Sequence, residues 1–171
     1  EETGEADETL VAALEKALEA ALCSLTRMRE KEGARLKADL LARMETIERL
    51  TGCIAARAPL VAAQYREKLT ERIHEYLAGK ADETRILTEA AVFADKCSID
   101  EELTRLKAHI KAFREIAQLD EVGRKLDFLV QEFNRECNTI CSKSNDGEVT
   151  ALALEMKNEI EKVREQIQNL E

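Results

Sequence analysis

The predicted helix over residues 121–143 carries a face of side chains suited to nucleic-acid or metal chemistry. Its members lie three or four residues apart along one side of the helix: Arg124, Asp127, Gln131, Asn134, Asn138 and Ser142. An ordinary solvated face uses Glu and Lys, because Asn is a poor helix former. Amide and guanidinium groups bind phosphates and bases through several hydrogen bonds, and interspersed carboxylates can hold a divalent cation. The alternative is a polar network between helices that holds their register.

The preceding predicted helix adds a possible acid or base. Glu102, Arg105 and His109 follow each other at spacings of three and four residues, opposite the apolar seam. A histidine on a polar face can be a metal ligand or a general acid/base, or it can pair with Glu101 or Glu102. Acid, base and phosphate-binding residues on neighbouring helices suit metal-assisted hydrolysis. The sequence has no nucleophile elbow, P-loop or dinucleotide fingerprint.

The composition predicts that helices position these residues. Of 171 residues, 44% are apolar and 36% charged, with one proline, six aromatic rings and a net charge of −9. Long amphipathic helices have this composition, whereas strands favour aromatic residues and need frequent turn residues. No apolar run approaches the roughly 18 residues of a membrane span. Because no segment is strongly basic, any RNA binding must use a local arrangement of side chains.

The apolar periodicity predicts successive helices. The expected ranges are about 7–31, 34–57, 59–78 and 83–97, followed by a helix that opens at Ser98, a helix over 121–143 and a final helix that follows a cap at Asn145 or Asp146. Gly33 either breaks or loosens the chain after the first range, and Pro59 is expected to start the third, because proline is costly inside a helix. The predicted fold is all-α, an elongated antiparallel helical bundle or a set of coiled-coil hairpins. The predicted division is a region of long charged helices over 1–80 and a C-terminal helical domain over 81–171.

Local signals refine two of the helix starts. Ser98 and Glu101 have the spacing of a capping box, and Asn145 or Asp146 is the expected cap of the last helix. The seam of the helix after Ser98 is Ile99, Leu103, Leu106, Ile110, Phe113 and Ala117. The seam of the next helix is Leu126, Val130, Phe133, Cys137 and Ile140.

The five cysteines predict free thiols in a reducing compartment, because their number is odd and their spacing scattered. Cys137 and Cys141 lie one helical turn apart, which leaves a metal site conceivable. No second cysteine pair or clustered histidine lies nearby, so close packing between helices is the preferred interpretation.

The C-terminal half resembles a known family. The residues that carry the likeness are 122–128 (VGRKLDF), 131–136 (QEFNRE), Asn138-Thr139, Ser142-Lys143 and 164–171 (REQIQNLE). Upstream, 99–103 (IDEEL) is followed by Arg105-Leu106 and His109. Together they resemble the YicC/YloC family of bacterial endoribonucleases over about residues 83–171. Residues 7–80 resemble that family only as long charged helices.

The resemblance implies a cytoplasmic RNA-cleaving protein that depends on a divalent metal cation, Mn or Mg, and assembles as a homo-oligomer, with a hexamer as the expected form. It also implies that this chain is the C-terminal helical portion, with the N-terminal domain of such proteins missing. The expected partners are therefore RNA and further copies of the chain, without a membrane.

The first functional hypothesis is thus the C-terminal part of a metal-dependent endoribonuclease that recognises structured RNA by its shape, because aromatic residues for stacking are few. The candidate catalytic residues are Glu102, His109, Glu132 and Glu136, and the candidate metal ligands are Asp127, Glu132, Glu136 and His109. The candidate RNA-binding residues are Arg105, Arg124, Lys125, Asn134, Arg135, Asn138 and Lys143.

The second hypothesis is a non-catalytic module for oligomerisation or for binding RNA or a partner, which the heptad seams favour. In that case the polar face lies between subunits, and Asn134→Ala would change the oligomeric state rather than RNA affinity.

Overall fold

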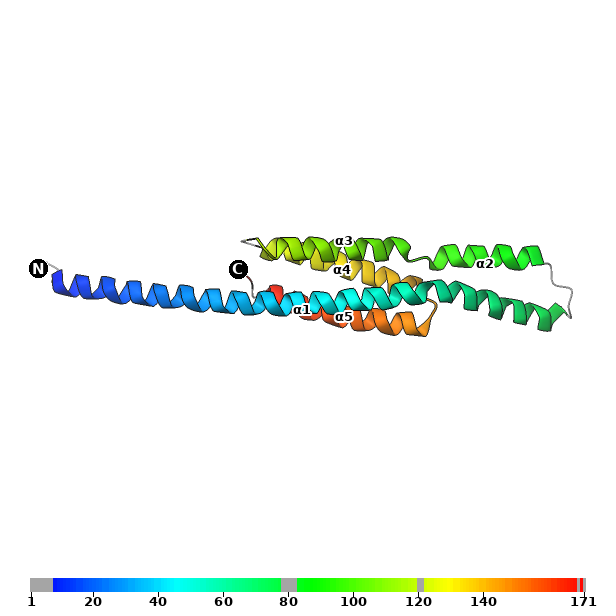
Figure 1. The fold of residues 1–171 in the computed structure, drawn as a ribbon, viewed down its shortest axis with the longest axis horizontal. Helices are drawn as coiled ribbons and strands as arrows, with labels where there is room; N and C mark the ends of the chain where they lie inside the picture. Colours follow the sequence, from blue (N-terminus) through cyan, green and yellow to red (C-terminus); the bar gives the residue numbers. More distant parts are fainter. Residues whose placement is uncertain (1–7, 78–82, 120–121, 169, 171) are drawn as a thin grey trace, which may run out of the picture. The chain divides into compact units, whose positions relative to one another are not determined.

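The structure is a computed structural model that describes residues 8–77, 83–119, 122–168 and 170. Within these ranges it contains five α-helices and no strand, so the all-α prediction is confirmed. The helices are α1 (Glu8–Leu77), α2 (Glu83–Cys97), α3 (Asp100–Ile116), α4 (Gly123–Lys143) and α5 (Gly147–Ile167), coloured along the chain in Figure 1. None of these helices combines the length and apolar character needed to cross a membrane.

The first helix corrects the prediction of three separate helices in this part of the chain. Helix α1 continues through both Gly33 and Pro59. A methyl group at Gly33 would meet nothing within 4 Å, so this glycine only lowers helix propensity. Pro59 costs about 3 kcal/mol inside a helix. Contacts on both sides offset that cost, since Ile54 before it is buried and Val61 after it packs against the core.

The chain divides into two compact units, residues 1–39 and residues 40–171. The described part of the first unit is a single helical segment. The second unit contains the rest of α1 and the four shorter helices. The predicted boundary near residue 80 is a different division and stays a prediction.

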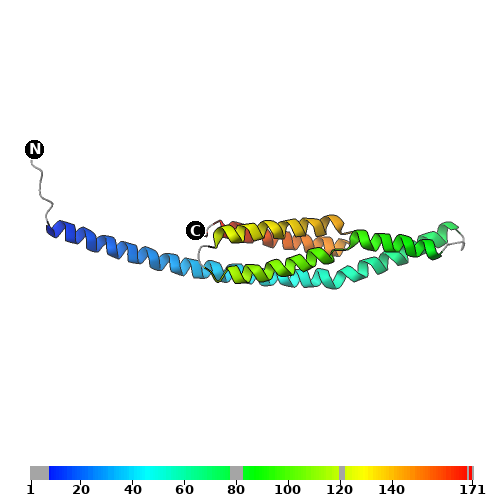
Figure 2. The same cartoon turned by 90° about the horizontal axis from the view of Figure 1, so that it is seen from above.

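The second unit is an antiparallel bundle in which residues 40–61 of α1 pack with α3, α4 and α5. The following turns of α1 lie beside α2, where the rings of Tyr65 and Phe93 stack with their centroids 3.5 Å apart, as Figure 2 shows for the two helices. Two ion pairs show the relative directions of α1 and α5. Arg43 pairs with Glu159, whereas Arg57, later in α1, pairs with Asp146, earlier in the chain than Glu159. Helix α1 is therefore antiparallel to α5. Short connections make α3 and α4, and then α4 and α5, antiparallel neighbours.

The predicted seams form the core of this bundle. Every member of the two predicted seams, from Ile99 to Ala117 and from Leu126 to Ile140, is at most 8% exposed. Helix α1 adds Leu40, Met44, Ile47, Leu50 and Ile54, and α5 adds Val149, Ala153, Met156, Ile160, Val163 and Ile167. The spacing of three and four residues gave the correct buried face because only that face meets the neighbouring helices.

The two predicted helix caps had different outcomes. The capping box at Ser98 is wrong: α3 begins one residue later, at Asp100, and its cap residue Ile99 has no side-chain hydrogen bond. The Ser98 hydroxyl instead donates to the Asp100 carboxylate, at 3.3 Å. The cap at Asp146 is confirmed, because its Oδ1 accepts from the amides of Glu148 and Val149 at 3.1 and 2.9 Å.

Candidate metal centre

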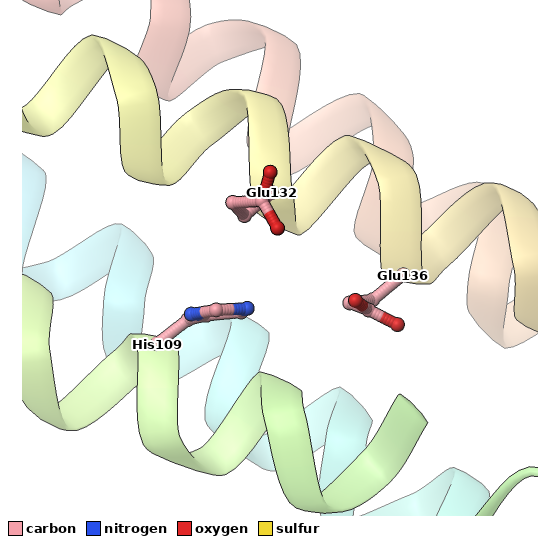
Figure 3. A group of neighbouring side chains, drawn as sticks. All are labelled: His109, Glu132 and Glu136. Atoms are coloured by element: carbon pink, nitrogen blue, oxygen red, sulfur yellow. The ribbon is translucent and has the colours of Figure 1, made fainter. Parts of the chain in front are cut away.

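Three side chains of metal-ligand type meet between α3 and α4. His109 projects from α3, and Glu132 and Glu136 project from α4, where a separation of four residues puts both carboxylates on one face. One ligand atom from each residue lies within 4.8 Å of the other two. Figure 3 shows the three side chains directed into the same space. These residues are called the His109 cluster below.

The His109 cluster is largely sheltered from solvent. Glu136 is 2% exposed, and the side chain of Glu132 is 24% exposed. Among the residues that the structure describes, the buried Nε2 atom of His109 has no hydrogen-bond partner. Leaving a buried polar atom unpaired costs about 1–3 kcal/mol. With its proton on Nδ1, this ring would offer the Nε2 lone pair to a cation.

Two neighbours hold the cluster in place. The imidazole of His109 meets the Phe133 ring edge to face, with centroids 5.9 Å apart. Arg105 lies one turn before His109 on α3, and its Nη1 is 3.3 Å from Oε1 of Glu136. That hydrogen bond is the main reason why the pKa of Arg105 is raised, and a nearby Glu101 carboxylate adds to it. The guanidinium therefore balances part of the charge on the buried Glu136.

The donor set fits a divalent cation. Two carboxylates suit Mg²⁺ or Mn²⁺, and an imidazole shifts the preference toward transition metals. Ligand atoms about 2.1 Å from such an ion lie roughly 3–4 Å apart, so a separation of up to 4.8 Å needs only small side-chain movements. Three protein ligands would leave other coordination positions for water and substrate. The chemistry accessible to this arrangement is metal-assisted hydrolysis.

Glu102, a predicted catalytic residue, lies outside the His109 cluster. One of its oxygens accepts from Nζ of Lys143 at 2.8 Å, and the same ammonium donates to the Ser98 carbonyl at 3.1 Å. Glu102 is 5% exposed, and within the described residues its Oε2 has no hydrogen-bond partner. Lys143, a predicted RNA contact, thus connects the end of α4 to the start of α3.

The remaining predicted residues on α4 lie along its length. Asp127, a predicted metal ligand, accepts a hydrogen bond from Gln131 at 2.9 Å and is not part of the His109 cluster. Arg124 and Lys125 are exposed in the first turn of the helix. Arg135 is 68% exposed and lies 3.7 Å from the Glu132 carboxylate. Arg135 thus connects the cluster to the solvent-facing side of α4.

The two predicted asparagines face α5. Asn134 donates to Glu161 at 3.4 Å, and Asn138 accepts from Lys157 at 3.0 Å. These contacts agree in part with a polar network between helices. A groove on this surface is lined by Asn134, Asn138 and Arg164, so Arg164 of α5 lies on the same surface as the two asparagines. Arg164 was not among the residues predicted to bind RNA, although it opens the 164–171 motif that carries the family resemblance.

The cysteine pair packs inside the bundle. Cys137 is fully buried and its thiol donates to the carbonyl of Ala153 at 3.1 Å. Burial raises the pKa of the Cys137 thiol to about 12. A thiol with that pKa is a poor metal ligand at neutral pH, since the thiolate is the binding form. This agrees with the packing interpretation.

Comparison with known proteins identifies the same family as the sequence motifs. The family described as endoribonuclease YicC-like, C-terminal, matches residues 54–171. The probable endoribonuclease YicC of Clostridioides difficile strain 630 is 45% identical over 174 residues, which cover 100% of this chain and 59% of the relative. The probable endoribonuclease YicC of Haemophilus influenzae is 39% identical over 151 residues, covering 88% of this chain and 52% of that relative. The chain thus spans little more than half the length of these curated relatives.

Proposed function

Because the chain belongs to the YicC-like endoribonuclease family, we propose that it forms the metal-binding part of an enzyme that hydrolyses phosphodiester bonds in RNA. The observation that carries this proposal is the His109 cluster, in which two carboxylates lie beside a buried imidazole nitrogen that has no hydrogen-bond partner among the described residues. The five free thiols suit the reducing cytoplasm as its location.

His109, Glu132 and Glu136 would hold the cation. A bound divalent cation supplies Lewis-acid activation of water and of the phosphate group. Glu136, buried and paired with Arg105, is suited to a fixed ligand role. Glu132 is more exposed, so one of its oxygens can accept the proton that leaves the attacking water. The exposed guanidinium of Arg135 lies beside Glu132 and can offset phosphate charge.

Contacts with the RNA backbone are proposed for exposed cations and amides near this site. Arg124, Lys125 and Arg135 are exposed, and Asn134 and Asn138 lie on the surface that faces α5. Arg105 is paired with Glu136, and Lys143 is paired with Glu102. To contact RNA, each of these two cations would have to exchange its carboxylate partner for a phosphate.

A cleavage assay tests the proposed reaction. The chain is mixed with a labelled hairpin RNA in Mn²⁺, in Mg²⁺ and in EDTA, beside the variants Glu132→Gln and His109→Ala. We expect metal-dependent cleavage that falls by 100-fold or more in both variants, because each removes a ligand. Glu115→Gln, an exposed carboxylate on α3, is the matched control. Equal cleavage by both cluster variants and the wild-type chain would contradict the proposed site.

One observation favours a second function, self-association through the first unit. Its seven large apolar side chains, from Leu10 to Met28, are 40–62% exposed. Residues 8–19 have a net charge of −2 and residues 20–31 have a net charge of +2. An antiparallel pairing with a second copy would cover the apolar side chains and place these opposite charges together, whereas a parallel pairing would oppose like charges.

Sedimentation equilibrium tests this second function. We expect the wild-type chain to form dimers and Leu18→Glu to remain monomeric, because the substitution puts a charge at the centre of the apolar stripe. Leu154→Glu changes an exposed leucine on α5 and should leave the dimer intact. A wild-type chain that stays monomeric at high concentration would exclude this pairing.

A further inference from the structure

A solvent-open groove runs between α4 and α5, next to the candidate metal centre. Its volume is about 520 Å³. The lining residues come from both helices and are Gln131, Asn134, Arg135, Asn138, Thr139 and Arg164. The groove contains two guanidinium groups and three side-chain amides, a composition suited to an anionic ligand that also offers hydrogen-bonding groups.

Within the part of the chain that the structure describes, each of the two arginines of the groove has a loosely paired carboxylate. Arg135 lies 3.7 Å from Glu132, and Arg164 lies 3.7 Å from Glu161. Their side chains are 68% and 50% exposed, so each pair is solvated and contributes little to stability. Both guanidinium groups can therefore turn toward a phosphate without losing a strong internal contact.

Two side-chain amides of the groove each use one of their two polar groups in a hydrogen bond within the protein. Asn138 accepts from Lys157 through Oδ1, which leaves its NH₂ group as a donor. Gln131 donates to Asp127 through Nε2, which leaves its carbonyl oxygen as an acceptor. The groove thus offers an NH₂ group that can donate to phosphate or base oxygens. It also offers a carbonyl oxygen that can accept from base or ribose donors.

The groove adjoins the His109 cluster through α4. Arg135 lines the groove and approaches Glu132, which belongs to the cluster. A phosphodiester chain held by Arg135 would therefore pass close to the candidate metal centre.

An exposed aromatic ring lies on α4 one turn before this point. Phe128 is 61% exposed, and helical geometry places it beside Gln131 and Glu132. Stacking of a base on an exposed aromatic ring contributes about 1–3 kcal/mol and requires a base that is free of its duplex partner. The position of Phe128 next to the groove thus favours unpaired over duplex RNA, which differs from the shape recognition of structured RNA expected from the low aromatic content.

We propose that the groove between α4 and α5 binds an unpaired segment of RNA, with Arg135 and Arg164 contacting its phosphates and Phe128 stacking on one base. This proposal rests on the proposed function, because the RNA that the groove binds would be cleaved at the candidate metal centre. Arg164 is a positioning residue in this arrangement, since it holds the backbone and does not touch the reacting atoms.

The proposal is tested by binding, in EDTA, where metal-dependent cleavage is absent. Fluorescence anisotropy compares a labelled 12-nucleotide oligouridine with a 12-base-pair RNA duplex. We expect Arg164→Gln to weaken oligouridine binding roughly ten-fold and to lower the slope of log affinity against log salt concentration by about 0.7, because one phosphate contact is lost. Arg164→Lys should recover part of the affinity.

Phe128→Ala tests the stacking contact. We expect it to weaken oligouridine binding roughly ten-fold and to leave duplex binding unchanged. The matched controls are Lys111→Gln, an exposed charge on α3, and Leu154→Ala, an exposed apolar side chain on α5; neither should change binding. Circular dichroism confirms that each variant keeps its helix content.

The outcomes separate this proposal from the proposed function. Wild-type affinity in both Arg164→Gln and Phe128→Ala would overturn the groove proposal, even where Glu132→Gln abolishes cleavage. Equal weakening of duplex and oligouridine binding by Phe128→Ala would overturn the preference for unpaired RNA. Weakened oligouridine binding in the groove variants, with cleavage unaffected by Glu132→Gln, would support the groove and contradict the metal centre.

Discussion

His109, Glu132 and Glu136 each have a neighbour that decides what the side chain can do. Phe133 supports the imidazole, Arg105 balances the buried Glu136, and Arg135 faces the more exposed Glu132. The candidates named from the sequence and its family resemblance included all three, together with Glu102 and Asp127, which lie outside the His109 cluster. The ion pair between Glu102 and Lys143 could not be predicted, because it depends on the register between two antiparallel helices.

Thiol reactivity is a prediction at the residue scale. Burial raises the pKa of Cys137 to about 12, so at pH 8 only about one thiol in 10,000 is a thiolate. Cys23 and Cys53 are exposed. Brief iodoacetamide treatment followed by peptide mass spectrometry should find Cys23 and Cys53 modified and Cys137 modified only in guanidinium. Equal labelling of Cys137 in the native protein would show that the bundle core is open.

Helix ends explain where element-scale predictions from sequence succeeded and failed. Asn145 or Asp146 was predicted as the cap of the last helix, because a short polar side chain before an apolar run needs only local geometry, and the structure shows that Asp146 is the cap. The capping box at Ser98 failed because Glu101 pairs with Arg105 instead of returning to the cap position. Pro59 misled the prediction of a helix start, since tertiary packing on both sides of a proline cannot be seen in local sequence.

The cap of α5 gives a pH-dependent prediction. A hydrogen bond from Arg57, followed by one from the Val149 amide, lowers the pKa of Asp146. A lowered folded-state pKa means that the stabilisation is present above the unfolded pKa of roughly 4 and is lost as pH falls through the folded value. We expect Asp146→Ala to reduce the free energy of unfolding by about 1 kcal/mol at pH 7 and by much less at pH 2.

Urea unfolding at the two pH values measures this difference. Asp146→Asn keeps a capping side chain but removes the charge, so it should cost less than the alanine variant at pH 7. Asp95→Asn, on an exposed face of α2, serves as the control. A penalty for Asp146→Ala that is the same at pH 7 and pH 2 would contradict the role of the charged cap.

Two glycines should respond oppositely to alanine. A Cβ atom at Gly123, the first residue of α4, would lie 2.9 Å from the backbone oxygen of Leu170, so the chain must shift. At Gly52, inside α1, it would meet nothing within 4 Å. We expect Gly123→Ala to lower the thermal midpoint and Gly52→Ala to raise the free energy of unfolding by about 0.5–1 kcal/mol. A Gly123→Ala protein as stable as wild type would contradict this close approach.

For the molecule as a whole, the sequence was sufficient for the helical class and for the buried faces of α3 and α4. It did not predict the division of the chain at residues 39 and 40, because the apolar stripe of the first unit has the same periodicity as the core-facing stripe that follows it. Burial separates the two, since Leu14 is 62% exposed and Leu40 is 2% exposed.

This difference predicts uneven protection along one continuous helix. Amides of residues 40–54, on whose face the side chains are buried, should exchange hydrogen slowly, and those of residues 9–38 should exchange fast in dilute protein. Hydrogen–deuterium exchange with mass spectrometry measures both segments of α1. Higher protein concentration should slow exchange in residues 9–38 if copies pair there. Uniformly slow exchange along α1 in dilute protein would contradict the burial pattern.

Binding of Mn²⁺ to the chain tests the central claim most directly, because it depends on the His109 cluster and not on RNA or cleavage. In isothermal titration calorimetry we predict one Mn²⁺ per chain for the wild type, and affinity at least about 10-fold weaker for His109→Ala and for Glu132→Gln. Glu155→Gln, an exposed carboxylate of α5, should bind as the wild type does. Unchanged Mn²⁺ affinity in both cluster variants would show that these residues do not form the metal centre.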